Sequence, residues 1–172
     1  MTPPSEPLVL LAGCFFNNCI MENERKPFNK ESRKRVSFEE IIGMLDNSKE
    51  YHFAIIDDQV DDELIEIAQK EGIDITGYKH VIETSGTSHS QNRHGEKSND
   101  RRPLKKEDYC LIPEIIRHRD SVILSPSATR IHKNPVFIYE KLIGDNYVYV
   151  EEIRQGRNKS LVFQSLRKRK AP

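Results

Sequence analysis

The sequence of 172 residues contains only three cysteines, no tryptophan and no apolar run long enough to span a membrane. Cys14, Cys19 and Cys110 are too few for a disulfide framework, and their spacing contains no CxxC metal motif. A small and odd number of cysteines is typical of a reducing compartment. We therefore expect a cytoplasmic protein with no membrane partner.

The motifs of several common enzyme classes are also missing. The sequence has no glycine-rich phosphate loop, no GxSxG elbow, no HExxH and no zinc-finger spacing, which disfavours P-loop nucleotide hydrolysis and metalloprotease chemistry. Residues 8–14, "LVLLAGC", are similar to the end of a bacterial lipoprotein signal. No Lys or Arg precedes them and the apolar run is short, so we expect a buried segment or a loosely held start rather than lipidation at Cys14.

The net charge of zero conceals two oppositely charged parts. Residues 39–74 carry twelve Asp or Glu against two Lys, a net charge of −10, so the remaining residues carry +10. From Arg154 to Lys170 there are seven Lys or Arg and no acid. This asymmetry indicates an anionic partner for the basic part and an acidic part that balances its charge within the molecule.

The first half of the chain predicts a small acidic α/β unit. Ser37 and Glu40 form a capping box before an amphipathic helix, residues 51–56 are rich in strand formers, and residues 61–72 read as a second helix that stops at Gly72. The predicted organisation is a flexible or extended lead (1–36), an acidic α/β lobe (37–76) and a C-terminal domain (77–170).

The C-terminal domain begins with helical patterns and ends with strands. Residues 78–83 predict a short strand, residues 84–95 a polar helix, and residues 105–120 a helix restarted at Pro113. The runs "SVILS", "PVFIYEKL", "NYVYVEEI" and "KSLVFQSLR" follow, and short turns between the last three favour antiparallel neighbours. The predicted fold class is therefore α+β, with N-terminal helices followed by a four-stranded antiparallel β-meander.

A polar stretch at residues 85–102 contains His89 and His94 and no apolar side chain. Imidazole is the natural acid–base group at neutral pH. Five residues apart on a continuous helix, the two histidines lie about 140° around the axis, so they share one site only if the helix ends near His94. Two solvated surface histidines are the alternative, and a zinc site with Glu96 and Cys110 is a second alternative without the usual i,i+4 histidine spacing.

The last strand supplies a second group of polar side chains. In "FQSLRKRK", alternation predicts that Phe163, Ser165 and Arg167 share one face. A hydroxyl beside a guanidinium can bind an oxyanion or a phosphate. Tyrosines and a lysine on the neighbouring strands are suited to stacking on bases or binding phosphates, although such aromatics also serve ordinary sheet packing; they are Tyr139, Lys141, Tyr147 and Tyr149.

The order of these elements resembles a known family. "GYKHVIETSGTSHSQNRHG", "LKKEDYCLIPEIIRHRDSVIL" and "VFIYEKLIGDNYVYVEEIRQGRNKSLVFQSLRK" together resemble the phage-associated branch of the barnase–EndoU–colicin–RelE (BECR) ribonuclease fold. The resemblance covers roughly residues 77–168. Each piece alone is weak, but the ordered set is fairly specific.

The resemblance implies a set of site residues. The implied catalytic residues are His89, His94, Ser165, Arg167 and Glu151, with Glu152 as the alternative glutamate. Ser165 keeps the hydroxyl of the threonine usual in relatives, whereas Arg167 replaces a common aromatic residue. The expected RNA-binding residues are Arg93, Arg101, Arg102, Tyr139, Lys141 and Lys168.

The resemblance implies a metal-independent RNA endonuclease, toxin-like and of phage or mobile-element origin. It would act in a bacterial host cell without a cofactor and would need an immunity or antitoxin protein as partner, or tight control. The alternatives are a non-catalytic RNA-binding module on the same fold and a structural or protein-interaction domain. We also expect part of the acidic residues 39–74 to lie near the basic sheet and to temper RNA binding.

Overall fold

The computed structural model describes residues 34–45, 50–126, 134–156 and 158–172. Most of the predicted lead (1–36), with Cys14 and Cys19, lies outside these residues. Within the described ranges the strands are β1 (Lys34–Arg35), β2 (His52–Asp57), β3 (Lys79–Glu83), β4 (Ser121–Ser125), β5 (Val136–Ile143), β6 (Asp145–Arg154) and β7 (Ser160–Arg169). The helices are α1 (Phe38–Gly43), α2 (Asp62–Lys70), α3 (Thr84–His94), α4 (Lys106–Tyr109) and α5 (Ile112–Arg117).

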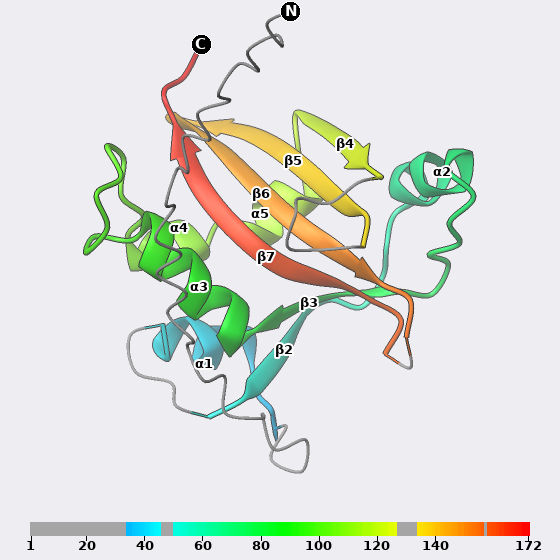
Figure 1. The fold of residues 1–172 in the computed structure, drawn as a ribbon, viewed down its shortest axis with the longest axis horizontal. Helices are drawn as coiled ribbons and strands as arrows, with labels where there is room; N and C mark the ends of the chain where they lie inside the picture. Colours follow the sequence, from blue (N-terminus) through cyan, green and yellow to red (C-terminus); the bar gives the residue numbers. More distant parts are fainter. Residues whose placement is uncertain (1–33, 46–49, 127–133, 157) are drawn as a thin grey trace, which may run out of the picture.

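The strands form one mixed sheet in the order β1-β2-β3-β7-β6-β5-β4 (Figure 1). The four runs predicted in the C-terminal part become β4 to β7, each antiparallel to the next along the chain. The sheet continues past β7 because β3 pairs with β7 in parallel and β2 pairs with β3. The sheet is therefore larger than the four strands predicted, and residues 37–76 contribute β2 to it.

The helix ends follow the signals in the sequence. In the capping box before α1, Ser37 Oγ accepts from the Glu40 backbone N–H (3.1 Å) and the Ser37 N–H donates to Glu40 Oε2 (2.7 Å). The Asp61 carboxylate caps α2 by accepting from the Leu64 N–H (3.0 Å), and Gly72 beyond its end has a φ of 73°.

No helix in the described ranges is long and apolar enough to cross a membrane.

The core lies on one face of the sheet, under α1, α2, α4 and α5. Tyr139, Tyr149 and Phe163 come from neighbouring strands, and their rings pack with centroids 5.4 and 5.6 Å apart. Tyr109 of α4 packs edge-on against Phe163, with centroids 6.3 Å apart. Buried isoleucines and leucines of α1, α2 and α5 complete this cluster. Figure 1 shows α5 behind the central strands.

Alternate residues of the same strands point to the opposite face of the sheet, here called the outer face. Buried valines such as Val148 and Val162 lie on it and are not members of the core cluster. From the pairing register, the outer face includes Val81 and Glu83 of β3, Ile138 and Glu140 of β5, Val148, Val150, Glu152 and Arg154 of β6, and Val162, Gln164, Ser165 and Arg167 of β7.

Helix α3 seals the edge of β7 beyond the point where β3 stops pairing. β3 pairs only with residues 160–162, and α3 then lies alongside β7 (Figure 1). Ser90 Oγ donates to the Leu166 carbonyl (3.2 Å) and accepts from the Leu166 N–H (3.1 Å) and the Tyr109 hydroxyl (3.1 Å). Because one serine hydroxyl satisfies both backbone groups of Leu166, a helix takes the place of a strand at this edge.

Gly86 permits the close approach of α3, so we expect Gly86→Ala to destabilise the fold. A Cβ at Gly86 would lie 2.7 Å from the Phe163 carbonyl oxygen and 3.1 Å from its ring. Both atoms belong to packed structure, and such overpacking costs about 1–3 kcal/mol in the free energy of unfolding, measurable by urea denaturation. Gly43→Ala is the matched control because nothing lies within 4 Å of its added Cβ. Equal stabilities for the two variants would contradict this account of the edge.

The acidic residues 39–74 contact two arginines at and just after the end of α5. Asp57 accepts from Arg117 Nε (2.9 Å), and Asp61 accepts from both terminal nitrogens of Arg119 (2.7 and 2.9 Å). Burial opposes ionisation of both aspartates, but the arginine bonds together with a backbone hydrogen bond to each carboxylate hold their pKa values below the ordinary one. These contacts join the end of β2 and the start of α2 to the end of α5 and the residues that follow it.

Candidate active site

His94 is the last residue of α3 and is held next to a carboxylate. The Gly95 N–H closes the helix on the Gln91 carbonyl (2.8 Å), and the chain then returns so that the Leu104 N–H donates to the His94 carbonyl (2.6 Å). This loop places Asp100 Oδ2 2.8 Å from His94 Nδ1. The helix therefore ends at His94, as the sequence predicted.

Asp100 is itself fixed by the loop. Its N–H donates to Ser98 Oγ (3.2 Å), and its Oδ1 accepts from the Arg102 N–H (3.2 Å). The bond from His94 and then that from Arg102 hold the pKa of Asp100 below its ordinary value. An ionised Asp100 favours the His94 tautomer with the proton on Nδ1, which leaves Nε2 to exchange a proton with a ligand.

Arg167 lies within electrostatic reach of this pair. Its side chain is partly buried on the outer face, opposite Val148. Burial and then Arg169 lower the pKa of Arg167, whereas the carboxylates of Glu140 and Asp100 act in the opposite direction. Helix α3 runs alongside β7 in the same direction, with Gly86 next to Phe163 and Ser90 next to Leu166. Its end at His94 therefore lies near the part of β7 that carries Arg167, whose guanidinium can attract a phosphate.

Ser165 shares the outer face with Arg167, but Phe163 does not, so the prediction that all three share one face was wrong. The register shifts between them: Glu151 pairs with Phe163, whereas Val150 pairs with Ser165. Gln164 is the extra residue of this bulge, which reverses the alternation. Phe163 consequently points into the core and Ser165 away from it.

His89 lies earlier on α3, with an exposed side chain. Both histidines belong to this helix, so their side chains leave its axis about 140° apart. The structure pairs His94, and not His89, with Asp100. The two histidines are thus on one element but directed to different sides of it.

Glu151 is fully buried on the core face, away from Ser165 and Arg167. It accepts from the hydroxyls of Tyr139 (2.8 Å) and Tyr149 (2.6 Å) and contacts His80 Nδ1 (2.9 Å). Burial opposes the charge on His80, but Glu151, helped by Asp57 and Asp61, raises the pKa of His80. Because Glu151 is 0% exposed, its carboxylate is part of the core and is not presented to a ligand.

Glu152 points to the outer face instead. Its carboxylate accepts from Gln164 Nε2 (2.9 Å), Asn134 Nδ2 (2.6 Å) and Arg154 Nε (3.3 Å). The Arg154 guanidinium also bonds to Glu83 (3.0 Å). Of the two glutamates that the resemblance offered, Glu152 is the one that shares a face with Ser165 and Arg167.

The residues predicted to bind RNA are divided between the surface and the interior. The side chains of Arg93 and Arg101 are exposed. Tyr139 is fully buried in the core, so it has no face on which a base could stack. The other three form ion pairs: Arg102 with Asp145, Lys141 with Asp120 (3.1 Å), and Lys168 with the buried Asp108 (2.9 Å).

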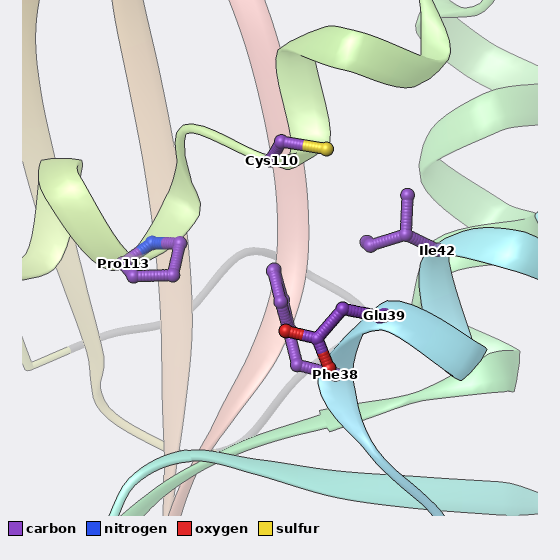
Figure 2. Close-up of a pocket in the computed structure, with 5 residues that line it drawn as sticks. All are labelled: Phe38, Glu39, Ile42, Cys110 and Pro113. Carbon is purple, nitrogen blue, oxygen red and sulfur yellow. The ribbon is translucent and has the colours of Figure 1, made fainter.

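Neither a zinc site nor the pocket beside α1 is suited to the chemistry of this site. Within the described ranges, no three His, Cys, Asp or Glu side chains are grouped as metal ligands, and His94 contacts Asp100 rather than the Glu96 and Cys110 of the zinc alternative. A pocket between α1 and the α4–α5 segment is lined by Phe38, Glu39, Ile42, Cys110 and Pro113 (Figure 2). This lining is mainly apolar and contains no cationic side chain, so the pocket is not suited to a phosphate.

A histidine–carboxylate pair beside an arginine, set on a helix at the edge of an α+β sheet, is an arrangement suited to cleaving phosphodiesters. Residues 58–171 match the family model described as phage-Barnase-EndoU-ColicinE5/D-RelE like nuclease3. The chain belongs to this nuclease family, whose implied substrate is a nucleic acid. The resemblance seen in the sequence is thereby confirmed, and the match begins within the predicted acidic lobe. Comparisons with curated proteins and with solved structures give no match.

Proposed function

We propose that the protein is a metal-independent RNA endonuclease, toxin-like and of phage or mobile-element origin. The observation that carries this proposal is the His94–Asp100 pair at the end of α3, which lies along the part of β7 that carries Arg167. A ribonuclease of this kind endangers its own cell, so we also propose an immunity or antitoxin protein as its partner.

The residues supply the parts that RNA cleavage by the 2′-hydroxyl requires. A base removes the 2′-OH proton as the 2′-oxygen bonds to phosphorus, and an acid protonates the 5′-oxygen as the P–O5′ bond breaks. His94, through Nε2, serves as one of these groups. The resemblance implies His89 as the other, although its side chain leaves α3 about 140° around the axis from that of His94. Arg167 stabilises the additional negative charge on the phosphate, and the Ser165 hydroxyl donates to it. The products are a 2′,3′-cyclic phosphate and a 5′-hydroxyl.

Glu152 takes the place that the resemblance assigns to a strand glutamate. Glu152 and Val150 are successive outer-face residues of β6, and Val150 is paired with Ser165. Glu152 therefore lies on the outer face close to Ser165. Its bonds to Gln164 and Arg154 hold the carboxylate in one orientation. We therefore propose Glu152, in place of Glu151, which points into the core, as the glutamate of the site.

Exposed cations would hold the rest of the RNA. Arg93 on α3, Arg101 in the following loop, and Arg169 and Lys170 at the end of β7 have exposed side chains. Contacts of this kind act on backbone phosphates, so binding should weaken steeply as the salt concentration rises.

The proposal is tested by incubating the purified protein with RNA in EDTA, beside DNA of the same sequence. We expect discrete RNA fragments and intact DNA, because DNA lacks the attacking 2′-hydroxyl. A His89→Ala/His94→Ala double variant should leave the RNA intact. Cleavage of the DNA, or RNA cleavage that EDTA abolishes, would contradict the proposal.

A non-catalytic RNA-binding module is the second candidate function. It is favoured by Arg167, which stands where an aromatic residue is common in the family and which binds phosphate whether or not cleavage follows. RNA binding that is sensitive to salt, with the RNA left intact in every buffer, would support this candidate instead.

A further inference from the structure

The loop between α3 and α4 is built around a contact that the sequence patterns did not reveal. We propose that Asp100 is a positioning residue, which holds the proton of neutral His94 on Nδ1 and so makes Nε2 the atom that exchanges protons with the substrate. The catalytic consequence rests on the proposed function. The tautomer itself does not, and can be tested without a substrate.

The geometry of the pair supports this role. Asp100 Oδ2 lies 2.8 Å from His94 Nδ1, a distance typical of a charge-assisted hydrogen bond. The two side chains are 23% and 25% exposed, so the bond is partly shielded from water while the ring keeps some access to solvent. A carboxylate accepts hydrogen bonds only, and the ring nitrogen that faces it must carry the proton.

The loop holds Asp100 through bonds at both ends. Where the loop begins, the Ser98 hydroxyl donates to the Gly95 carbonyl (2.6 Å) and accepts from the Asp100 N–H (3.2 Å). At its end, the Leu104 N–H donates to the carbonyl of His94 itself (2.6 Å), which forms a bridge beside Gly95. Both ends of the loop therefore lie beside His94, and Asp100 in the middle of the loop contacts the same histidine.

The charge of Asp100 is available to a proton-transfer step. Its bonds to His94 and to the Arg102 N–H keep the carboxylate ionised by lowering its pKa. When Nε2 accepts a proton, the positive ring that forms is next to this negative charge. The same carboxylate acts on Arg167, so Asp100 joins the proton-transfer group to the phosphate-binding group.

The test compares Asp100→Asn with the wild type in two measurements. An asparagine amide can donate to Nδ1, which favours the opposite tautomer. In ¹⁵N NMR spectra of the full chain at high pH, we expect the wild-type His94 signals to show a protonated Nδ1, and the Asp100→Asn signals to move toward a protonated Nε2. In RNA cleavage, kcat should fall between about 10²- and 10⁴-fold while KM changes little.

Two further variants distinguish positioning from a merely structural role. Asp100→Glu keeps the carboxylate and should recover part of kcat. Asp74→Asn is the matched control, because this exposed aspartate also orders a loop by accepting a backbone N–H (Thr76, 2.9 Å) but is not part of the site. Its kcat and the His94 signals should equal those of the wild type.

The outcomes separate this inference from the proposed function. If the wild type cleaves RNA, but the His94 tautomer and kcat are unchanged in Asp100→Asn, the positioning role is wrong and the nuclease proposal stands. If the wild type cleaves no RNA, the nuclease proposal fails and the NMR measurement decides on Asp100 alone. Wild-type His94 with its proton on Nε2 would overturn the inference under either outcome.

Discussion

Replacing His94 by alanine is expected to lower the rate of RNA cleavage by about 10²- to 10⁴-fold, the contribution usual for a positioned acid or base. The variant should stay folded, because the His94 side chain is partly exposed and its main bond is to a loop carboxylate. Single-turnover rates with excess enzyme, measured in EDTA, isolate the chemical step from RNA binding.

His118→Ala is the matched control for this variant. His118 also follows a helix and lies near a carboxylate, 3.9 Å from Glu114, but its side chain is 65% exposed and lies outside the site. We expect its cleavage rate to equal that of the wild type. Equal rates for His94→Ala and the wild type would remove His94 from the mechanism, whatever the control shows.

Replacing Glu151 by alanine is expected to cost about 3–5 kcal/mol in the free energy of unfolding. The substitution leaves His80, 1% exposed, without its carboxylate partner, and it deprives two buried tyrosine hydroxyls of their acceptor. Urea denaturation followed by circular dichroism measures the loss. Glu114→Ala removes an exposed glutamate and should change the same quantity by about 0.5 kcal/mol or less.

The stabilisation from this pair also depends on pH. Because Glu151 raises the pKa of His80 above its unfolded value, the contribution is complete below that value and is lost as pH rises through the raised one. Asp57 and Asp61 act on His80 in the same direction. The difference in stability between the wild type and Glu151→Gln should therefore shrink as pH rises. A difference that grows with pH would show that His80 is not the charged partner.

Much of the fold was accessible from local sequence patterns. The capping box at Ser37, the cap at Asp61 and the stop at Gly72 depend on neighbouring residues only, and the structure has all three. The strands β4 to β7 follow from β-rich runs, with short connections between the last three. The pairing of β3 with β7 joins residues about 80 positions apart, and no local pattern records such a contact.

The site was less accessible, for physical reasons that differ between residues. The bulge at Gln164 reverses the alternation on which the predicted face of Phe163 depended. Glu151 and Glu152 are adjacent and chemically equal, so only the register of β6 decides which of them points into the core. Asp100 reaches His94 because residues 95–104 form a closed loop. Closure of a loop produces no periodic pattern in the amino-acid sequence, so this contact could not be predicted from it. An isolated Asp a few residues after a histidine was the available hint.

The most direct test of the central claim is an analysis of the ends of the fragments that the protein makes from a defined RNA in EDTA. Mass spectrometry distinguishes cleavage by the 2′-hydroxyl from cleavage that leaves a 5′-phosphate, because the two give fragment ends of different mass. Attack by the 2′-hydroxyl predicts fragments with a 2′,3′-cyclic phosphate and fragments with a 5′-hydroxyl. Fragments that carry a 5′-phosphate, or RNA that remains intact, would contradict the account.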